Sequence, residues 1–210
     1  MHRLARLRGV NPAPISGLDA LLVNQIFFYD DPARFTDSVN KLCDELEERA
    51  AQSTGVRPAD TPRILVSGCP QAIPNWKVPA IVESSGAVIV GDESCVGERG
   101  MRNEVVSQGD DIDSLLDDLV ERYFQIDCAI FTPNKPREEH IREMVADYKA
   151  DGVIHYGLQF CGPYQIEAGP VEKALEADSI PVLRLETDYS QEDVGQLQTR
   201  VEAFVERIRK

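Results

Sequence analysis

The spacing of hydrophobic residues changes near residue 63, from helical periodicity to short apolar runs separated by amphipathic stretches. The apolar runs, rich in Val, Ile and Leu, predict strands at 64–68, 87–92, 152–158 and 181–186. The amphipathic stretches predict helices at 75–84, 111–124, 137–150, 164–177 and 191–210. Continuously apolar strands that alternate with helices are typical of a parallel sheet covered on both faces. We therefore expect an α/β fold, with a doubly wound parallel sheet of about four strands.

The segment before this body is expected to be a helical hairpin. Ser16 can cap a helix that runs to Ile26 or beyond, and this helix is apolar around most of its circumference, which predicts burial. Pro32 suits the first turn of a second helix. Residues 1–14 are basic and contain prolines, so we expect an arm there, and residues 53–62 read as a linker. The expected domains are an N-terminal arm and helical connector, residues 1–60, and an α/β domain, residues 61–210.

The composition narrows the classes of function. The 210 residues include 22 Lys and Arg against 36 Asp and Glu, which gives a formal net charge of −14. Such a surface repels phosphate backbones and anionic lipids, so we expect neither a nucleic-acid nor a membrane partner. No apolar run approaches the roughly 20 residues of a membrane span, and the first residues lack the apolar core of a signal peptide. We therefore expect a cytoplasmic protein.

Five cysteines are the main candidates for chemistry. The set is odd in number and widely spaced, which argues for free or metal-bound thiols and against a disulfide framework. Cys69, Cys95 and Cys161 follow predicted strands, and the carboxyl ends of parallel strands meet at one edge, where ligands bind. Cys128 opens an apolar run instead of following one, so its place at that edge is less well defined. Cys43 lies inside a predicted helix and is expected to be a packing residue.

Residue types alone leave several interpretations of these thiols open. They can be inert, because cysteine often acts as a small buried hydrophobe. A structural zinc site would be expected to use CxxC pairs, and the chain contains none. Thiolates gathered from separate loops are compatible with a [4Fe–4S] cluster, which ranks above zinc for this reason.

Other candidate groups carry less weight. The chain lacks GxxxxGKS/T, so ATP hydrolysis through a phosphate loop is not expected. His155 is expected to be a core histidine with satisfied hydrogen bonds, and His140 to be solvated on an acidic helix. Carboxylates near strand ends can form a pair for acid–base work, although most acidic residues in such a chain are solvated. These carboxylates are Glu93, Glu98, Glu186 and Asp188.

Three long segments resemble the 2-hydroxyacyl-CoA dehydratase family, which also contains benzoyl-CoA reductase subunits and double-cubane-cluster proteins. They are SGCPQAIPNWKVPAIVESSGAVIVGDESCVGERG (67–100), YKADGVIHYGLQFCGPYQIE (148–167) and LRLETDYSQEDVGQLQTRVEAF (183–204). The stretch PISGLDALLVNQIFFYDDPARF near the start extends the resemblance over almost the whole chain.

The resemblance implies an iron–sulfur subunit of two similar α/β domains that hold a cluster between them. An ATP-hydrolysing activator would inject a low-potential electron, and in the dehydratases a ketyl radical would then eliminate water from a 2-hydroxyacyl-CoA. The cysteine of the family motif GVIxYxLQFC is a cluster ligand, which carries over to Cys161. The other ligands in the dehydratases come from the N-terminal domain.

The chain departs from the family in its length. It is about half of what the family pattern predicts and resembles the C-terminal domain with the helical connector, without the N-terminal domain. A cluster held by Cys161 alone would lack ligands, so the isolated chain is not expected to catalyse the family reaction or to keep a cluster. Either the chain is a fragment, or a partner chain supplies the missing domain.

The extra cysteines suggest a further hypothesis. Double-cubane members hold an [8Fe–9S] cluster of two fused cubes, so Cys161 can join absent cysteines on one cube. The other cube would then be held by Cys69, Cys95 and Cys128, and this assignment requires Cys128 to lie near the others. The alternatives to a dehydratase half-subunit are therefore a double-cubane reductase of small molecules and a non-catalytic half-subunit. A homodimer through the thiol-bearing edge is also compatible with the sequence.

Overall fold

The structure is a computed structural model that describes residues 1–209. The strands are β1 (Arg63–Gly68), β2 (Val88–Asp92), β3 (Gly152–Leu158) and β4 (Val182–Thr187). The helices before and beside β2 are α1 (His2–Arg8), α2 (Gly17–Ile26), α3 (Pro32–Ala51), α4 (Lys77–Ser84) and the 3₁₀ turn η1 (Arg99–Met101). The later helices are α5 (Ile112–Phe124), α6 (Lys135–Asp147), α7 (Gly162–Ala177) and α8 (Val194–Ile208).

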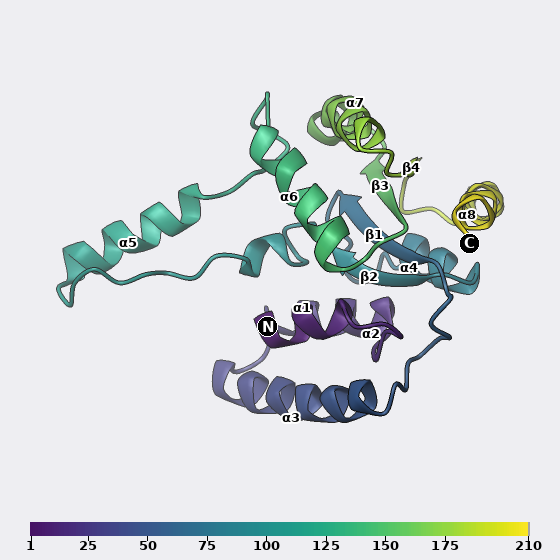
Figure 1. Cartoon of the computed structure of the whole chain (residues 1–210). Helices are drawn as coiled ribbons and strands as arrows, with labels where there is room; N and C mark the ends of the chain where they lie inside the picture. Colours follow the sequence, from purple (N-terminus) through teal and green to yellow (C-terminus); the bar gives the residue numbers. More distant parts are fainter. Residues whose placement is uncertain (210) are drawn as a thin grey trace.

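The four strands form one parallel sheet in the order β2-β1-β3-β4 (Figure 1). This confirms the predicted fold class. The chain runs outward from β1 to β2 and then crosses back to place β3 on the other side of β1. The point where the strand order reverses therefore lies between the carboxyl ends of β1 and β3, which is where ligands bind in such sheets.

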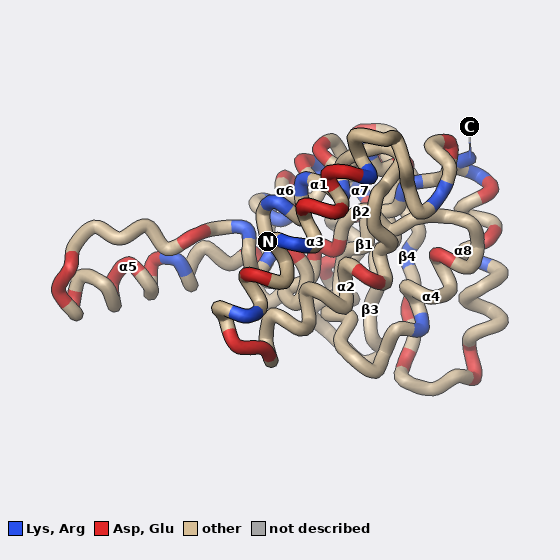
Figure 2. The backbone as a smooth tube through the Cα atoms, turned by 90° about the horizontal axis from the view of Figure 1, so that it is seen from below, with Lys and Arg blue, Asp and Glu red and all other residues tan. Residues whose placement is uncertain are grey.

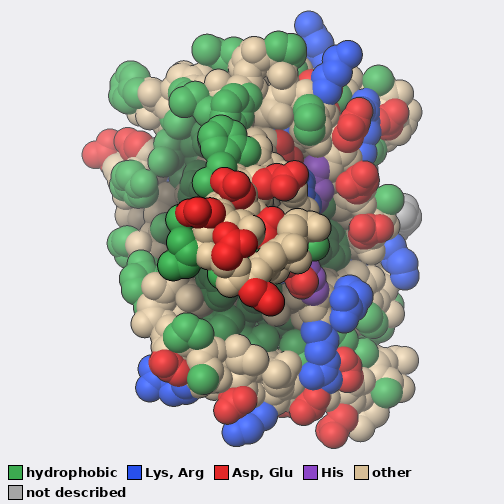
Figure 3. Space-filling model, turned by 90° about the vertical axis from the view of Figure 1, so that its left-hand side faces the viewer, with side chains coloured by type: hydrophobic (Ala, Val, Ile, Leu, Met, Phe, Trp, Pro, Cys, Tyr) green, Lys and Arg blue, Asp and Glu red, His purple; other side chains and the backbone are tan. Residues whose placement is uncertain are grey.

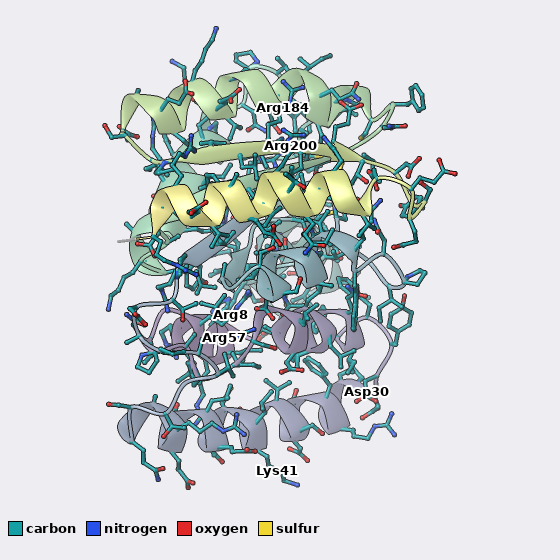
Figure 4. All side chains as sticks on the ribbon, turned by 90° about the vertical axis from the view of Figure 1, so that its right-hand side faces the viewer. Arg8, Asp30, Lys41, Arg57, Arg184 and Arg200 are labelled. Atoms are coloured by element: carbon teal, nitrogen blue, oxygen red, sulfur yellow. The ribbon has the colours of Figure 1, made fainter. Side chains whose placement is uncertain are left out.

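Helices cover both faces of the sheet. Side chains alternate along β1, so that Ile64 packs with the core under α4 and α8 while Leu65 packs with the core under α6 and α7. Figure 4 looks at the molecule with α8 in front, and shows Arg200 of that helix close to Arg184 of β4. The Arg200 guanidinium donates to the Arg184 carbonyl at 2.6 Å.

The N-terminal helices form a third layer next to β2. Residues 2–8 are helical where we expected an arm, because Leu4 and Leu7 are buried against the inner face of α3. Cys43 of α3 is fully buried in that cluster, as expected of a packing residue. Lys41 lies on the outer side of the same helix (Figure 4).

The expected burial of α2 is confirmed for most of the helix, but one side of it is exposed. Ala20 and Leu21 are buried, but Leu22 and Ile26 are 37% and 39% exposed. The helix is covered where it faces β2 and α4, and also where Ala20 and Val23 pack in the cluster with α3. The division of the chain at residues 1–60 and 61–210 remains a prediction, and residue 210 of the predicted closing helix lies outside the described residues.

One segment leaves the body altogether. Residues 104–125, here called the α5 hairpin, run out along an extended stretch and return as α5 (Figures 1 and 2). Acidic residues are frequent along it, as the red parts of the tube in Figure 2 show. None of the apolar residues of α5 belongs to the three core clusters of the described residues.

Candidate functional site

Two cysteines meet at the point where the strand order reverses. Cys69 follows β1, and its N–H donates to the carbonyl of Tyr156 on β3 at 2.8 Å. Cys161 follows β3 and occupies the cap position before α7, where the helix dipole favours negative charge. The N–H of Leu158 points at the Cys69 sulfur from 3.4 Å. Burial, together with the adjacent thiol of Cys161, raises the pKa of Cys69 to about 12.

A glycine makes this close approach possible. Gly68, the last residue of β1, has φ +113°, a conformation that L side chains rarely adopt. A Cβ at this position would lie 2.0 Å from the carbonyl oxygen of Tyr156. Because Gly68 has no side chain, the backbone can turn at the end of β1 close to the backbone of β3. This turn places Cys69 next to the start of α7.

The other two candidate cysteines lie in neighbouring loops, near enough for their charges to interact. Cys95, which lies in the loop after β2, is exposed, and Cys128 is half-buried. Partial burial raises the pKa of the Cys95 thiol, and the nearby Cys128 raises it further while Arg99 opposes the shift. The Cys95 thiol also raises the pKa of Tyr164, which lies in the first turn of α7 after Cys161. Ala129, next to Cys128, packs in the same buried cluster as Cys69 and Tyr164.

A buried ion-pair cluster lies beneath these thiols. Arg137, which has no exposed surface, donates to Glu93 at 2.9 Å and is hydrogen-bonded to Glu167. Glu93 also accepts from the Ser67 hydroxyl at 3.0 Å, and Arg99 lies 3.4 Å from its second oxygen. Burial raises the pKa of Glu167, while Arg137 opposes the shift.

Tyr164 and His155 are also buried, next to Arg137 of the ion-pair cluster. The Arg137 guanidinium lies 5.0 Å from the centre of the Tyr164 ring, and Arg99 donates to the Tyr164 hydroxyl at 3.0 Å. Burial raises the pKa of Tyr164 to about 12. His155 is buried as expected, but neither ring nitrogen has a hydrogen-bond partner among the described residues. Burial and the charge of Arg137 lower its pKa to about 4.

The structure also shows where His140 lies, and where the carboxylates that were candidates for acid–base work lie. Glu93 belongs to the ion-pair cluster, and Glu98 binds Arg8 at 2.7 Å. Asp188 follows β4 directly, and its carboxylate accepts a hydrogen bond from the Ser190 N–H at 2.7 Å. His140 is not solvated: its side chain is 12% exposed and lines a cavity of about 610 Å³ between α1, α6 and residues 98–102. None of the four candidate cysteines lines this cavity.

The donor set at the edge of the sheet suits an iron–sulfur cluster in type but does not complete one. Thiolates are the usual ligands of such clusters, and the structure brings the four candidate cysteines together as two pairs. Among residues 1–209, no group of three or more His, Cys, Asp or Glu side chains is arranged to hold a single metal ion. The fit is therefore partial: Cys69 and Cys161 offer two adjacent thiols, fewer than an iron–sulfur cluster requires.

Sequence patterns did not reveal the residues of the ion-pair cluster. Arg137 stands in a markedly polar helix, KPREEHIREMVAD, where an arginine would be expected to face water. Arg99 and Glu167 are equally unmarked. Only the placement of Glu93 directly after β2 gave a signal, because side chains at strand ends point toward the ligand-binding edge.

Comparisons with known proteins find relatives that match nearly the whole chain. The chain is 36% identical over 204 residues to the putative dehydratase subunit YjiM of Escherichia coli, covering 95% of this chain and 51% of that protein. It is 25% identical over 209 residues to the (R)-phenyllactyl-CoA dehydratase beta subunit of Clostridium sporogenes, covering 99% and 53%. It is 29% identical over 179 residues to the beta subunit of (R)-2-hydroxyglutaryl-CoA dehydratase of Acidaminococcus fermentans, covering 82% and 45%.

The chain spans about half the length of these curated relatives. No helix among residues 1–209 is both long enough and apolar enough to cross a membrane. The family model described as 2-hydroxyglutaryl-CoA dehydratase, D-component, matches residues 1–208. The match extends over nearly the entire chain, and the chain therefore belongs to the 2-hydroxyglutaryl-CoA dehydratase D-component family.

Proposed function

We propose that this chain is the C-terminal half of an iron–sulfur subunit that acts in the dehydration of a 2-hydroxyacyl-CoA. The observation that carries the proposal is the meeting of Cys69 and Cys161 where the strand order reverses. Two thiols from separate loops meet at the edge where ligands bind in such sheets, which suits a shared metal centre. Cys161 is half-buried there, and Cys69 is buried beside it.

Cys161 is the first of the proposed ligands, and Cys69 is the second. Cys95 and Cys128 are further candidates from the neighbouring loops. A cluster bound by these thiolates would supply one-electron transfer at low potential. Around it, the Leu158 N–H donates toward the Cys69 sulfur, and such contacts stabilise negative charge on a ligand.

The buried ion-pair cluster would hold these ligands in place. Arg137 joins α6 to the loop after β2 through Glu93 and to α7 through Glu167. Cys95 lies two residues after Glu93, and α7 begins directly after Cys161. The ion pairs thus connect the two loops that carry the thiols, and fix their separation.

The remaining parts of the reaction lie outside this chain. We propose that the missing ligands come from an N-terminal domain or a partner chain, and that an ATP-hydrolysing activator delivers the electron. The beta-subunit names of the relatives support a partner chain. The acyl-CoA would then bind between this chain and that partner.

A double-cubane reductase of small molecules is the second candidate. The two thiol pairs favour it, because a single-cluster subunit needs fewer thiolates from this half. The earlier assignment grouped Cys69 with Cys95 and Cys128, whereas the sulfur next to Cys69 is that of Cys161. In this arrangement the two pairs, and not one thiol and three, would face the two cubes.

Iron uptake tests the proposal. The chain is reconstituted under anaerobic conditions with ferrous iron and sulfide, and excess 2-mercaptoethanol supplies the missing thiolates. Iron and acid-labile sulfide per chain are measured together with the visible absorbance of thiolate-bound iron. We expect uptake by the unmodified chain, and a loss of most of the iron in Cys161→Ser and in Cys69→Ser.

Cys43→Ser is the matched control, because Cys43 is a buried thiol in α3, away from the sheet edge. It should take up as much iron as the unmodified chain. The proposal fails if the unmodified chain binds no more iron than a variant lacking both Cys69 and Cys161. Iron loss in Cys95→Ser and Cys128→Ser as well would favour the two-cube alternative.

A further inference from the structure

The two thiols that meet where the strand order reverses differ in their access to solvent. Cys69 is 1% exposed, whereas Cys161 is half-buried at the start of α7, where the helix dipole favours negative charge. Burial raises the pKa of Cys69 to about 12, so this residue stays a thiol at neutral pH. An oxidant dissolved in water therefore reaches Cys161 first, and it is Cys161 that can attack as a thiolate.

Both cysteines are held against the same residue, Leu158 at the end of β3. The Leu158 N–H points at the Cys69 sulfur from 3.4 Å, and the Leu158 carbonyl accepts from the Cys161 N–H at 3.1 Å. The Cys161 side chain also packs on the buried cluster that contains Cys69. These contacts keep the two thiols adjacent without any bound group.

A strained turn brings Cys161 back to the end of the strand. Phe160 has φ +64°, in the left-handed region that bulky residues rarely adopt, and its side chain is 93% exposed. The backbone is held in this turn, because the Phe160 carbonyl accepts from the Gly162 N–H at 3.1 Å. Backbone strain of this kind clusters at functional sites.

We infer that Cys69 and Cys161 form a reversible disulfide when a peroxide reaches this edge of the sheet. The Cys161 thiolate attacks one peroxide oxygen, the oxygen–oxygen bond breaks, and the other oxygen leaves with a proton as water. Cys161 becomes a sulfenic acid. The Cys69 thiol then attacks the Cys161 sulfur, and the sulfenic oxygen leaves as water with the proton of Cys69. The two thiols together lose two electrons, which reduce the peroxide.

The charge of the chain favours a small uncharged oxidant. The formal net charge is −14, and Figure 3, which looks onto the side from which the α5 hairpin projects, shows acidic side chains gathered near its centre. Such a field repels anionic oxidants, including acidic peptide disulfides. Hydrogen peroxide carries no charge and is small enough to reach a half-buried thiol.

The disulfide would protect the more accessible thiol. A sulfenic acid that finds no second thiol is oxidised further to sulfinic acid, which is not readily reversed. Cys69 prevents this by trapping Cys161 in a form that a thiol reductant restores. The disulfide also withdraws both thiolates from metal binding, and this consequence, unlike the disulfide itself, rests on the proposed function.

Peptide mapping after peroxide treatment tests the inference. The reduced, metal-free chain is treated with an equimolar amount of hydrogen peroxide in the absence of oxygen, and is digested with trypsin without reductant. The five cysteines fall in different tryptic peptides, so each link can be assigned by mass spectrometry. We expect peptide 64–77 to be joined to peptide 150–173 in most chains. Dithiothreitol should remove the link and restore iron uptake, which the oxidised chain should have lost for the most part.

Substitutions separate the roles of the two thiols. In Cys69→Ala, Cys161 should be converted to sulfinic acid, whereas in Cys161→Ala, Cys69 should remain a free thiol. The matched control carries Cys95→Ser and Cys128→Ser, and should form the link as the unmodified chain does. Thermal unfolding shows whether each variant is folded, and if Cys69→Ala is not, the unmodified chain and Cys161→Ala decide the outcome.

Three results would overturn the inference. They are the absence of the link, a preferred link between Cys95 and Cys128, and oxidation of Cys69 in Cys161→Ala. Iron uptake by the reduced chain separates this inference from the proposed function. A linked chain that takes up no iron after reduction would support the disulfide and contradict the metal site, and iron uptake without any link would do the reverse.

Discussion

Arg137 is the residue on which the geometry beneath the candidate site depends most. It is fully buried and shared between two carboxylates, Glu93 and Glu167, which belong to different elements. Burying charges is costly, and an ion pair offsets that cost only while both partners are present. Removing the cation leaves Glu167 without its counter-charge in a dry environment, and leaves Glu93 paired with Arg99 alone.

We expect Arg137→Met to lower the free energy of unfolding by about 3–5 kcal/mol, because it breaks a buried ion pair from one side. Equilibrium unfolding in urea measures the change. Arg142→Met is the control: Arg142 pairs with Asp178 at the surface, where both side chains are more than one-third exposed. That variant should lose under about 1 kcal/mol. Equal losses in the two variants would contradict the importance of the buried cluster.

His155 makes stability depend on pH. Its pKa is lowered to about 4 in the folded chain by burial and by Arg137, whereas an unfolded chain titrates near about 6.5. Between these values the unfolded chain binds a proton that the folded chain does not. Stability from this residue is therefore complete above about pH 6.5 and is lost as the pH falls toward 4.

We expect His155 to contribute up to about 3 kcal/mol to this loss, from the difference between the two pKa values. The measurement is the free energy of unfolding between these pH values for the unmodified chain and for His155→Phe. The variant should show a shallower fall in stability with decreasing pH. His2→Gln, at an exposed position, should keep the slope of the unmodified chain. An unchanged slope in His155→Phe would mean that protonation of His155 does not cause the loss of stability at low pH.

At the scale of elements, the hydrophobic pattern predicted the sheet well. Residues 152–158 were predicted as a strand and form β3, and the other strands lie within a residue of the predicted bounds. Apolar runs in parallel strands are buried on both faces, so their pattern is unambiguous. The helix α1 was missed because it is short and has no side-chain cap, and its stability comes from burying Leu4 and Leu7.

The candidate site was predicted only in part, for a related physical reason. Strand ends determine where Cys69 and Cys161 lie, and these ends could be read from the sequence. The position of Arg137, which joins the loop of Cys95 to α7, could not be predicted, because this arginine becomes buried through tertiary packing of a polar helix. The outward direction of the apolar side chains of α5, such as Leu116 and Tyr123, was equally hidden. A periodic pattern shows that one side of a helix must be covered, but does not show by what.

Gly68 gives an element-scale prediction. A Cβ there would lie 2.0 Å from the Tyr156 carbonyl oxygen, and the positive φ adds strain. Gly68→Ala should therefore lower the free energy of unfolding by about 2 kcal/mol or more, and should weaken iron uptake by displacing Cys69. Gly195→Ala in α8 is the control, because a Cβ there meets nothing within 4 Å. It should be neutral or stabilise the helix by up to about 1 kcal/mol.

At the scale of the whole molecule, the sheet with its covering helices and the α5 hairpin are distinct parts. The sheet and the N-terminal helices share buried side chains, whereas the apolar residues of α5 lie outside the core clusters of residues 1–209. The two ends of the hairpin lie together, since the Asn103 side chain donates to Gln125 at 2.9 Å. A short connection can therefore replace the hairpin without moving the body.

We expect replacement of residues 105–124 by Gly-Gly to leave the free energy of unfolding of the monomer within about 1 kcal/mol of the unmodified chain. The shorter loop costs less entropy to close, and this offsets the lost hydrogen bonds of Arg122 and its neighbours. Urea unfolding measures this, with the unmodified chain, which keeps the hairpin, as the reference. Iron uptake should be unchanged, because the thiols and Arg137 remain. A loss above about 3 kcal/mol would mean instead that the hairpin is part of the folded body.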